Sequence, residues 1–222
     1  MILISGDVHG ERDFEHIEKN PKINNLTEKD YLIICGDFGI GFQENFLNKL
    51  KQKKYTILFL DGNHENFPYL NSLKVEKWNN GYIHKIAENI YHLMRGQIYE
   101  IENKTFFTFG GAKSISNKNQ IEDLNWFPKL EEGTKEEQEI GMKNLANYNF
   151  SVDYILTHTC SSTYLQILSG YLTMFLEESD TNIYLEKLET MVKYKKWFFG
   201  HFHEDIKIDN KTTLIFKNTI KL

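Results

Sequence analysis

Five short segments of this 222-residue chain place metal-binding types of side chain directly after apolar stretches that resemble strands. The turn that follows a strand can aim a side chain at a point beyond the strand's carboxyl end. Several such strands in one fold would bring their polar ends together. The five segments are Gly6-Asp7-Val8-His9, Gly36-Asp37, Gly62-Asn63-His64-Glu65, Thr157-His158 and Gly200-His201-Phe202-His203.

Short apolar runs rich in β-branched and aromatic residues predict buried strands. The predicted strands are Ile2–Ser5, Tyr31–Cys35, Thr56–Leu60, Thr105–Phe109, Tyr154–Thr157, Trp197–Phe199 and Thr213–Lys217. Asn103-Lys104 between Ile98–Glu102 and Thr105–Phe109 predicts a hairpin.

Apolar residues at helical spacing predict helices between these strands. The predicted helices are Glu44–Lys54, Glu136–Tyr148 and Asn182–Tyr194. Thr134 lies three residues before Glu137, a pattern typical of a capping box. Strands that alternate with helices predict an α/β architecture. Because no repeat or linker interrupts the pattern, we expect one domain over residues 1–222.

Two segments show no single periodicity. Ala112–Gly133 is expected to form a long surface loop near the polar strand ends. Ser161–Ser179 is compatible with a helix or with a partly mobile flap. We expect these two segments to select the ligand.

Composition excludes several classes of protein. The formal net charge is −5, without a strongly basic block, which disfavours a long nucleic acid duplex as partner. No apolar run approaches the ~20 residues of a membrane span, and no signal pattern is present. We therefore expect a cytoplasmic protein without a membrane partner. Cys35 and Cys160 follow or lie within apolar runs and are expected to be buried free thiols. The sequence gives no indication of the oligomeric state of the protein.

The polar strand ends together offer two Asp, one Asn and up to five His. Each residue alone has an ordinary explanation, such as an acidic turn residue or a buried histidine. Taken together they favour a site for two divalent ions. Carboxylates and imidazoles without thiolates suit Mn²⁺, our first choice, and Fe, Zn²⁺ or Ni²⁺ as alternatives.

The order Asp-x-His, Gly-Asp, Gly-Asn-His-Glu, His and Gly-His-x-His, from Asp7 to His203, resembles the calcineurin-like metallophosphoesterase superfamily. Leu60–Asn66 and Met94-Arg-Gly-Gln97, followed by Gly110-Gly111-Ala112, resemble a compact bacterial or phage-type branch of it. The resemblance implies a four-layer α-β-β-α sandwich with two mixed sheets and an active site at the carboxyl ends of the strands.

The resemblance also implies roles for individual residues. Asp37 would bridge two metal ions, and a hydroxide shared by the ions would attack phosphate mono- or diesters. His64 would bind no metal but would face the substrate and assist the leaving oxygen. The first ion would be bound by Asp7, His9 and His203, and the second by Asn63, His158 and His201.

The segment around Asp37 departs from the pattern of the serine/threonine phosphatases in this superfamily. Those enzymes supply a phosphate-gripping arginine in an Asp-Arg-Gly motif, whereas this chain reads Gly36-Asp37-Phe38-Gly39-Ile40-Gly41. The chain's two arginines, Arg12 and Arg95, are therefore the candidates for gripping phosphate. Glu204 or Asp205 is a candidate for orienting a histidine ligand.

Three functions follow as hypotheses. The first is a phosphoesterase that acts on a phosphorylated small molecule, a nucleotide or a phosphoprotein. The second is a nuclease that acts on short or single-stranded nucleic acid. The third is a non-catalytic binding module that metal ions stabilise; His64 argues against it, because a structural site has no need of a histidine that binds no metal.

Overall fold

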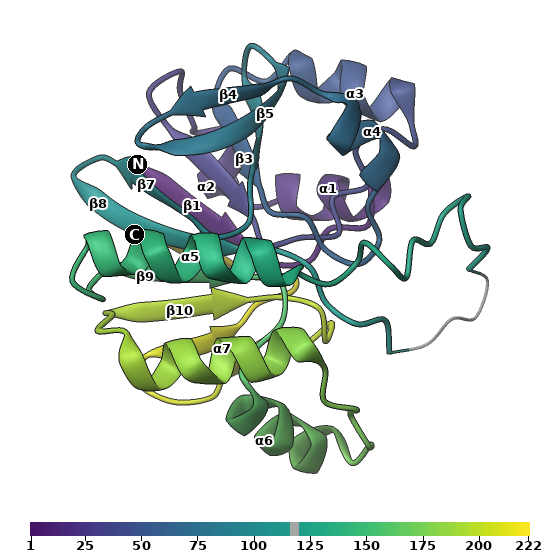
Figure 1. The fold of residues 1–222 in the computed structure, drawn as a ribbon. Coiled ribbons are helices and arrows are strands. Elements are labelled where there is room, and N and C mark those ends of the chain that lie inside the picture. Colours follow the sequence, from purple (N-terminus) through teal and green to yellow (C-terminus); the bar gives the residue numbers. More distant parts are fainter. Residues whose placement is uncertain (116–119) are drawn as a thin grey trace.

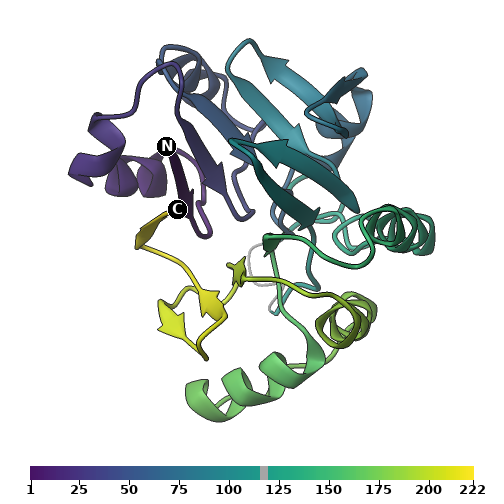
Figure 2. The same cartoon turned by 90° about the vertical axis from the view of Figure 1, so that its left-hand side faces the viewer.

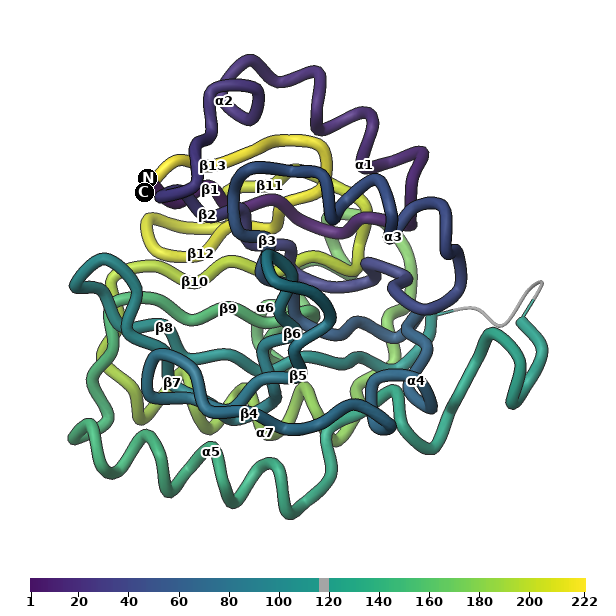
Figure 3. The backbone as a smooth tube through the Cα atoms, turned by 90° about the horizontal axis from the view of Figure 1, so that it is seen from above, coloured from purple at the N-terminus to yellow at the C-terminus, as the bar shows by residue number. Residues whose placement is uncertain are grey.

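The computed structural model describes residues 1–115 and 120–222, and its strands form two mixed sheets that pack face to face (Figure 1). Helices cover the outer face of each sheet. Figure 3 shows α1 and α5 on opposite sides of the strands. The predicted four-layer α-β-β-α sandwich is therefore confirmed.

In the described part of the chain, the first sheet has seven strands in the order β13-β1-β2-β3-β6-β5-β4. Strands β1, β2, β3 and β6 run parallel, and β13, β5 and β4 add antiparallel pairs at the two edges. The bounds are β1 Ile2–Ser5, β2 Tyr31–Ile34, β3 Thr56–Phe59, β4 Val75–Trp78, β5 Gly81–Ala87, β6 Ile90–Leu93 and β13 Thr219–Lys221.

The second sheet, as far as the chain is described, has six strands in the order β11-β12-β10-β9-β8-β7. Its four central strands run parallel, and β7 and β11 are antiparallel edges. The bounds are β7 Gln97–Ile101, β8 Lys104–Phe109, β9 Tyr154–Thr157, β10 Lys196–Phe199, β11 Ile206–Lys207 and β12 Thr212–Leu214.

Within residues 1–115 and 120–222, four helices belong to the outer layer of the first sheet and three to that of the second. The first group is α1 Glu11–Glu18, α2 Pro21–Asn24, α3 Glu44–Lys51 and α4 Phe67–Ser72. The second group is α5 Lys135–Asn147, α6 Ser162–Leu172 and α7 Asp180–Met191.

Alternation along the strands explains why both faces of each sheet are buried. Leu3 and Leu32 pack against the helices, whereas their neighbours Ile2, Ile4 and Ile33 fill the space between the sheets. Successive strand residues point to opposite faces. Burial on both faces therefore requires continuous apolar runs, and such runs allow these strands to be predicted from the sequence.

Several predicted elements are shifted. The hairpin between β7 and β8 turns at Glu102 and Asn103, both with positive φ, one residue earlier than predicted. The predicted strand Thr213–Lys217 is wrong at its end, because β12 stops at Leu214. In Ser161–Ser179 the helical alternative is confirmed for Ser162–Leu172, the extent of α6, whereas residues 173–179 are not helical. Thr134 and Glu137 form the predicted capping box at α5.

The sequence interpretation missed the shorter or more polar elements. These are α1, α2, α4, β4, β5, β6, β11 and β13. Of the predicted loop Ala112–Gly133, residues 116–119 lie outside the described residues. The described remainder of this loop contains an isolated β-bridge between Glu122 and Trp126. It contains neither a helix nor a strand of several residues.

Both cysteines are free and buried, as predicted. Among the described residues, no helix has the length and apolar character needed to cross a membrane. The two ends of the chain lie side by side (Figure 2), because β13 pairs with β1 and the Leu222 amide donates to the Ile2 carbonyl.

The packing between the sheets predicts a stability test. Phe106 on β8 is fully buried between the sheets. We expect Phe106→Ala to lower the free energy of unfolding by about 3–5 kcal/mol, because it leaves a cavity in a close-packed layer. Urea unfolding followed by circular dichroism measures this. Phe175→Ala, at a side chain that is 85% exposed, is the control and should change stability by no more than about 0.5 kcal/mol.

Candidate metal centre

The two sheets bring the polar strand ends of the chain to one place. In the first sheet, the parallel neighbours β1, β2 and β3 are followed by Asp7, Asp37 and Asn63. In the second, the parallel neighbours β9 and β10 are followed by His158 and by His201. The carboxyl ends of parallel neighbours meet at one edge, and contacts between the sheets complete the centre.

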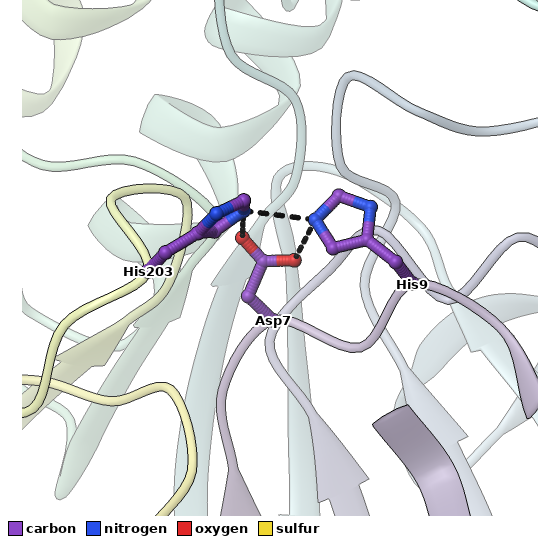
Figure 4. A group of neighbouring side chains, drawn as sticks. All are labelled: Asp7, His9 and His203. Carbon is purple, nitrogen blue, oxygen red and sulfur yellow. Dashed lines mark hydrogen bonds and ion pairs between the residues drawn. The ribbon is translucent and has the colours of Figure 1, made fainter. Parts of the chain in front are cut away.

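Asp7, His9 and His203 form the first group of possible ligands (Figure 4). His9 Nε2 lies 3.1 Å from Asp7 Oδ1, and His203 Nε2 lies 3.2 Å from Asp7 Oδ2. The two imidazole nitrogens face each other across 2.9 Å. Donor atoms this close need a proton or a cation between them.

Asp7, Asp37 and His158 form the second group. His158 Nδ1 lies 2.8 Å from the Cys35 carbonyl oxygen, to which it donates, so that Nε2 faces the centre. Nε2 lies 3.4 Å from Asp37 Oδ1 and 3.1 Å from Asn63 Oδ1. A backbone acceptor on one ring nitrogen is typical of histidines that bind metal through the other.

The carboxylate of Asp37 extends between the two groups. Its Oδ1 approaches His158, while its Oδ2 lies 3.7 Å from His9 Nε2. Asp7 is common to both groups. His201 lies beside His158, with ring centroids 5.0 Å apart, and its backbone N–H donates to Asp7. All seven predicted ligands are thus in one cluster.

Burial and charge shape the titration of this cluster. Burial opposes ionisation of Asp7, but hydrogen bonds from His203 and His9 bring its pKa well below 3.8. Burial likewise disfavours charge on His9 and His158, but Asp7 and Asp37 raise the pKa of each histidine to about 9. Without metal, protonated histidines therefore neutralise the carboxylates, and metal binding would displace those protons.

Three predicted ligands have left-handed backbones: φ is +55° at Asp37, +75° at His201 and +53° at His203. Such conformations are uncommon outside glycine and concentrate at functional sites. The backbone therefore turns at both histidines of Gly200-His201-Phe202-His203. The turn directs His203 towards His9, with ring centroids 4.9 Å apart, and His201 towards His158.

His64 lies beside these residues with a different set of contacts. Its backbone N–H donates to Asp37 Oδ1 at 2.7 Å, and its ring is 5.4 Å from that of His9. Burial lowers the pKa of His64, so its ring is mainly neutral at pH 7. With Asp37, Asn63 and His203 it lines a cavity of about 260 Å³, whose apolar wall contains Ile115, Leu172 and Met174. Both segments that we expected to select the ligand contribute to this wall.

The two arginines lie in different places. Arg12 is exposed and lines a cavity that also includes Asp7. Arg95 is buried, and its guanidinium donates to Asp61, to Glu137 and to three backbone carbonyls of residues 130–132. With its donors engaged inside the protein, Arg95 has a structural role, and the prediction that it grips phosphate is not retained.

Arg95 begins a chain of contacts that ends on a predicted ligand. It holds the backbone of Glu131, whose carboxylate accepts hydrogen bonds from Ser114 N, Ser114 Oγ and Trp126. Ser114 Oγ in turn accepts from Asn63 Nδ2 at 3.1 Å. This bond turns the Asn63 carbonyl oxygen towards His158. The sequence offered no signal for Ser114 or Glu131.

Two further residues support the ligand loops. Glu65 is fully buried and accepts backbone hydrogen bonds from Phe38 and Gly39, which joins the loops after β2 and β3. Burial raises the pKa of Glu65 well above 4.5. In the sequence, the position of Glu65 directly after Asn63-His64 was the signal that could have identified it as a residue of the site.

Asp205 accepts three backbone hydrogen bonds from residues 216–218. The Phe216 ring stacks on His203, with centroids 4.9 Å apart. Asp205 therefore orients a histidine through Phe216, without a direct contact to that histidine.

The donor set fits a pair of divalent ions. It offers carboxylate, amide and imidazole donors in two overlapping groups, and the thiols of Cys35 and Cys160 are buried, which raises the pKa of each. Neutral imidazole and carboxylate suit Mn²⁺, Fe and Zn²⁺.

Comparison with known proteins agrees with this geometry. The family model of calcineurin-like phosphoesterases matches residues 1–205. The chain belongs to this family. It is also similar to the lariat debranching enzyme of Schizosaccharomyces pombe (strain 972 / ATCC 24843), with 24% identity over 217 residues, or 91% of this chain and 42% of that enzyme. The chain thus spans about two-fifths of that relative's length. The description of this family indicates hydrolysis of phosphate esters.

The close approach at Gly62 predicts a loss of metal binding. A Cβ at this position would lie 2.0 Å from Asp37 Oδ1, so we expect Gly62→Ala to displace that carboxylate and to weaken Mn²⁺ binding at least about tenfold. Calorimetric titration with Mn²⁺ measures this. Gly170→Ala, where a Cβ meets no atom within 4 Å, is the matched control and should bind normally. Equal affinities in the two variants would contradict the role of Asp37.

The contact between Ser114 and Asn63 predicts a second effect. We expect Ser114→Ala to lower Mn²⁺ affinity about 10–100-fold, because the Asn63 amide loses the partner that fixes its orientation. The same titration measures it, with Ser72→Ala on α4 as the control. Wild-type affinity in Ser114→Ala would show that Asn63 is oriented by other contacts.

Proposed function

We propose that residues 1–222 form one domain that hydrolyses phosphate mono- or diesters with two divalent ions, Mn²⁺ first among them. The observation that carries the proposal is that Asp7, Asp37 and several imidazoles converge on one place. His64 lines the adjoining cavity but belongs to neither group of possible ligands.

The residues divide into ligands and a substrate-facing group. We assign Asp7, His9 and His203 to one ion and Asn63, His158 and His201 to the other, with Asp37 shared. When bound, the ions supply Lewis acidity that activates water and neutralises charge on phosphoryl oxygens.

His64 acts from the side of the cavity. Its ring is mainly neutral, and a neutral imidazole keeps one N–H with which it can hydrogen-bond to the departing oxygen. The hydrogen bond from its backbone to Asp37 fixes its position relative to the ligands. Phosphorylated small molecules, nucleotides and phosphoproteins are all candidate substrates of this centre.

A second candidate function is a nuclease that acts on short or single-stranded nucleic acid. The similarity to a lariat debranching enzyme favours it. Cleavage of oligonucleotides would support this function. Inertness towards them, together with turnover of small phosphate esters, would exclude it.

Turnover of p-nitrophenyl phosphate and bis(p-nitrophenyl) phosphate tests the main proposal. We expect metal-free protein to be inactive and added Mn²⁺ to restore activity. His64→Ala should lower kcat about 10²–10⁴-fold, because it removes the group that assists the leaving oxygen, while metal content stays unchanged. Asp37→Asn should lose activity together with metal.

Two results would contradict the proposal. Full activity of Asp37→Asn at saturating Mn²⁺ would refute the shared carboxylate. Absence of turnover by metal-replete wild type over a broad panel of phosphate esters would favour a non-catalytic binding module.

A further inference from the structure

A cavity of about 500 Å³ lies between α1 and the segment that follows β12. Asp7 is among its lining residues, so this cavity meets the metal centre, while the cavity that contains His64 meets the same centre through Asp37 and His203. Figure 3 shows the C-terminal segment, in yellow, running beside α1. We call the larger cavity the α1 groove. A substrate held at the metal ions can therefore extend into the α1 groove.

Side chains of basic residues line both walls of the α1 groove. Arg12, His16 and Lys19 follow one another at spacings of four and three residues, which places them on one side of α1 and its C-cap. Lys217 comes from the other wall. All four are exposed, and within residues 1–115 and 120–222 none forms a side-chain ion pair with a carboxylate.

The acidic residues on the α1 groove are already engaged. Asp13 accepts the backbone N–H of His9 at 3.2 Å, and Glu15 pairs with Lys49 at 2.8 Å. Asp7 belongs to the metal centre. With Glu15 paired and Asp7 in the metal centre, Arg12, Lys19 and Lys217 face one remaining carboxylate, that of Asp13. The groove therefore has a surplus of positive charge in a chain whose net charge is −5, and its occupant should be an anion.

An aromatic ring accompanies these charges. Phe216 lines the groove, its ring is nearly parallel to His203 at 14°, and Lys217 Nζ lies 5.4 Å from its centroid. A basic groove with an aromatic ring is the pattern by which proteins bind single-stranded nucleic acid, because cations follow the phosphates and bases stack on rings.

We propose that the α1 groove binds the phosphates and a base of a short single-stranded nucleic acid next to the phosphate at the metal centre. This inference rests on the proposed phosphoesterase function and narrows its substrate to a phosphodiester chain. Arg12 and Lys19 contact flanking phosphates. Lys217 leaves the Phe216 ring to contact a phosphate as well, and a base stacks on the face of Phe216 that His203 does not cover.

Binding can be measured without turnover. The probe is a fluorescent six-nucleotide thymidine strand, and anisotropy is recorded in EDTA at several salt concentrations. We expect the variant R12Q/K19Q/K217Q to bind the strand at least about tenfold more weakly than wild type. The slope of the logarithm of the binding constant against the logarithm of the salt concentration should become shallower by about two, because each phosphate contact to a single strand contributes about 0.7 to this slope. The control K77Q/K143Q/K187Q removes equal charge from exposed positions on β4, α5 and α7 and should match wild type.

An abasic strand of equal phosphate number tests the aromatic part. We expect it to bind wild type about fivefold or more weakly than the thymidine strand, because it cannot stack. Equal binding of the two strands would overturn the nucleic acid assignment in favour of a phosphate chain without bases.

Turnover separates failure of this inference from failure of the proposed function. In the presence of Mn²⁺, the fold-decrease in kcat/KM caused by R12Q/K19Q/K217Q (the groove variant) should be at least ten times larger for the oligonucleotide than for p-nitrophenyl phosphate. Equal oligonucleotide affinities of the groove and control variants, or equal losses of kcat/KM on both substrates, would refute the proposed role of the α1 groove without contradicting the phosphoesterase function. Absence of metal-dependent turnover of either substrate by wild type would instead refute the proposed function.

Discussion

Asp7 and Asp37 are fully buried carboxylates placed near each other, and the site depends on compensation of their charge. Two buried like charges are unfavourable unless cations accompany them. The metal-free fold provides protons held on His9 and His158, and a pair of divalent ions would provide stronger compensation. The same electrostatic requirement therefore links the stability of this region to metal binding.

The sandwich satisfies this requirement because each sheet supplies part of the centre. The first sheet contributes both carboxylates, His9 and Asn63, while the second contributes His158, His201 and His203. Neither sheet alone gathers a complete set of donors. Packing of the two apolar inner faces thus holds charges of opposite sign against each other, and the strained backbones at Asp37, His201 and His203 are retained there.

Around the ligands, a layer of polar contacts fixes side-chain orientation. Glu65 joins two ligand loops, Ser114 turns the Asn63 amide, and Asp205 acts through Phe216 on His203. Phe216 belongs both to this layer and to the α1 groove. Orientation of a ligand and recognition of an extended substrate therefore share a residue, which couples the metal centre to the proposed nucleic acid path.

The sequence by itself determined the α/β class and the polar donors that follow the strands, because buried parallel strands need continuous apolar runs and the turns after them carry these donors. The four-layer arrangement and the separation of seven ligands from His64 followed from the family resemblance. Only the tertiary structure decided the rest. Arg95 and Arg12 look alike in sequence, but one is enclosed by Asp61 and Glu137, whereas the other is exposed on α1. Ser114 meets Asn63 across 51 positions of sequence. Such contacts depend on how whole layers pack, and local periodicity carries no information about that packing.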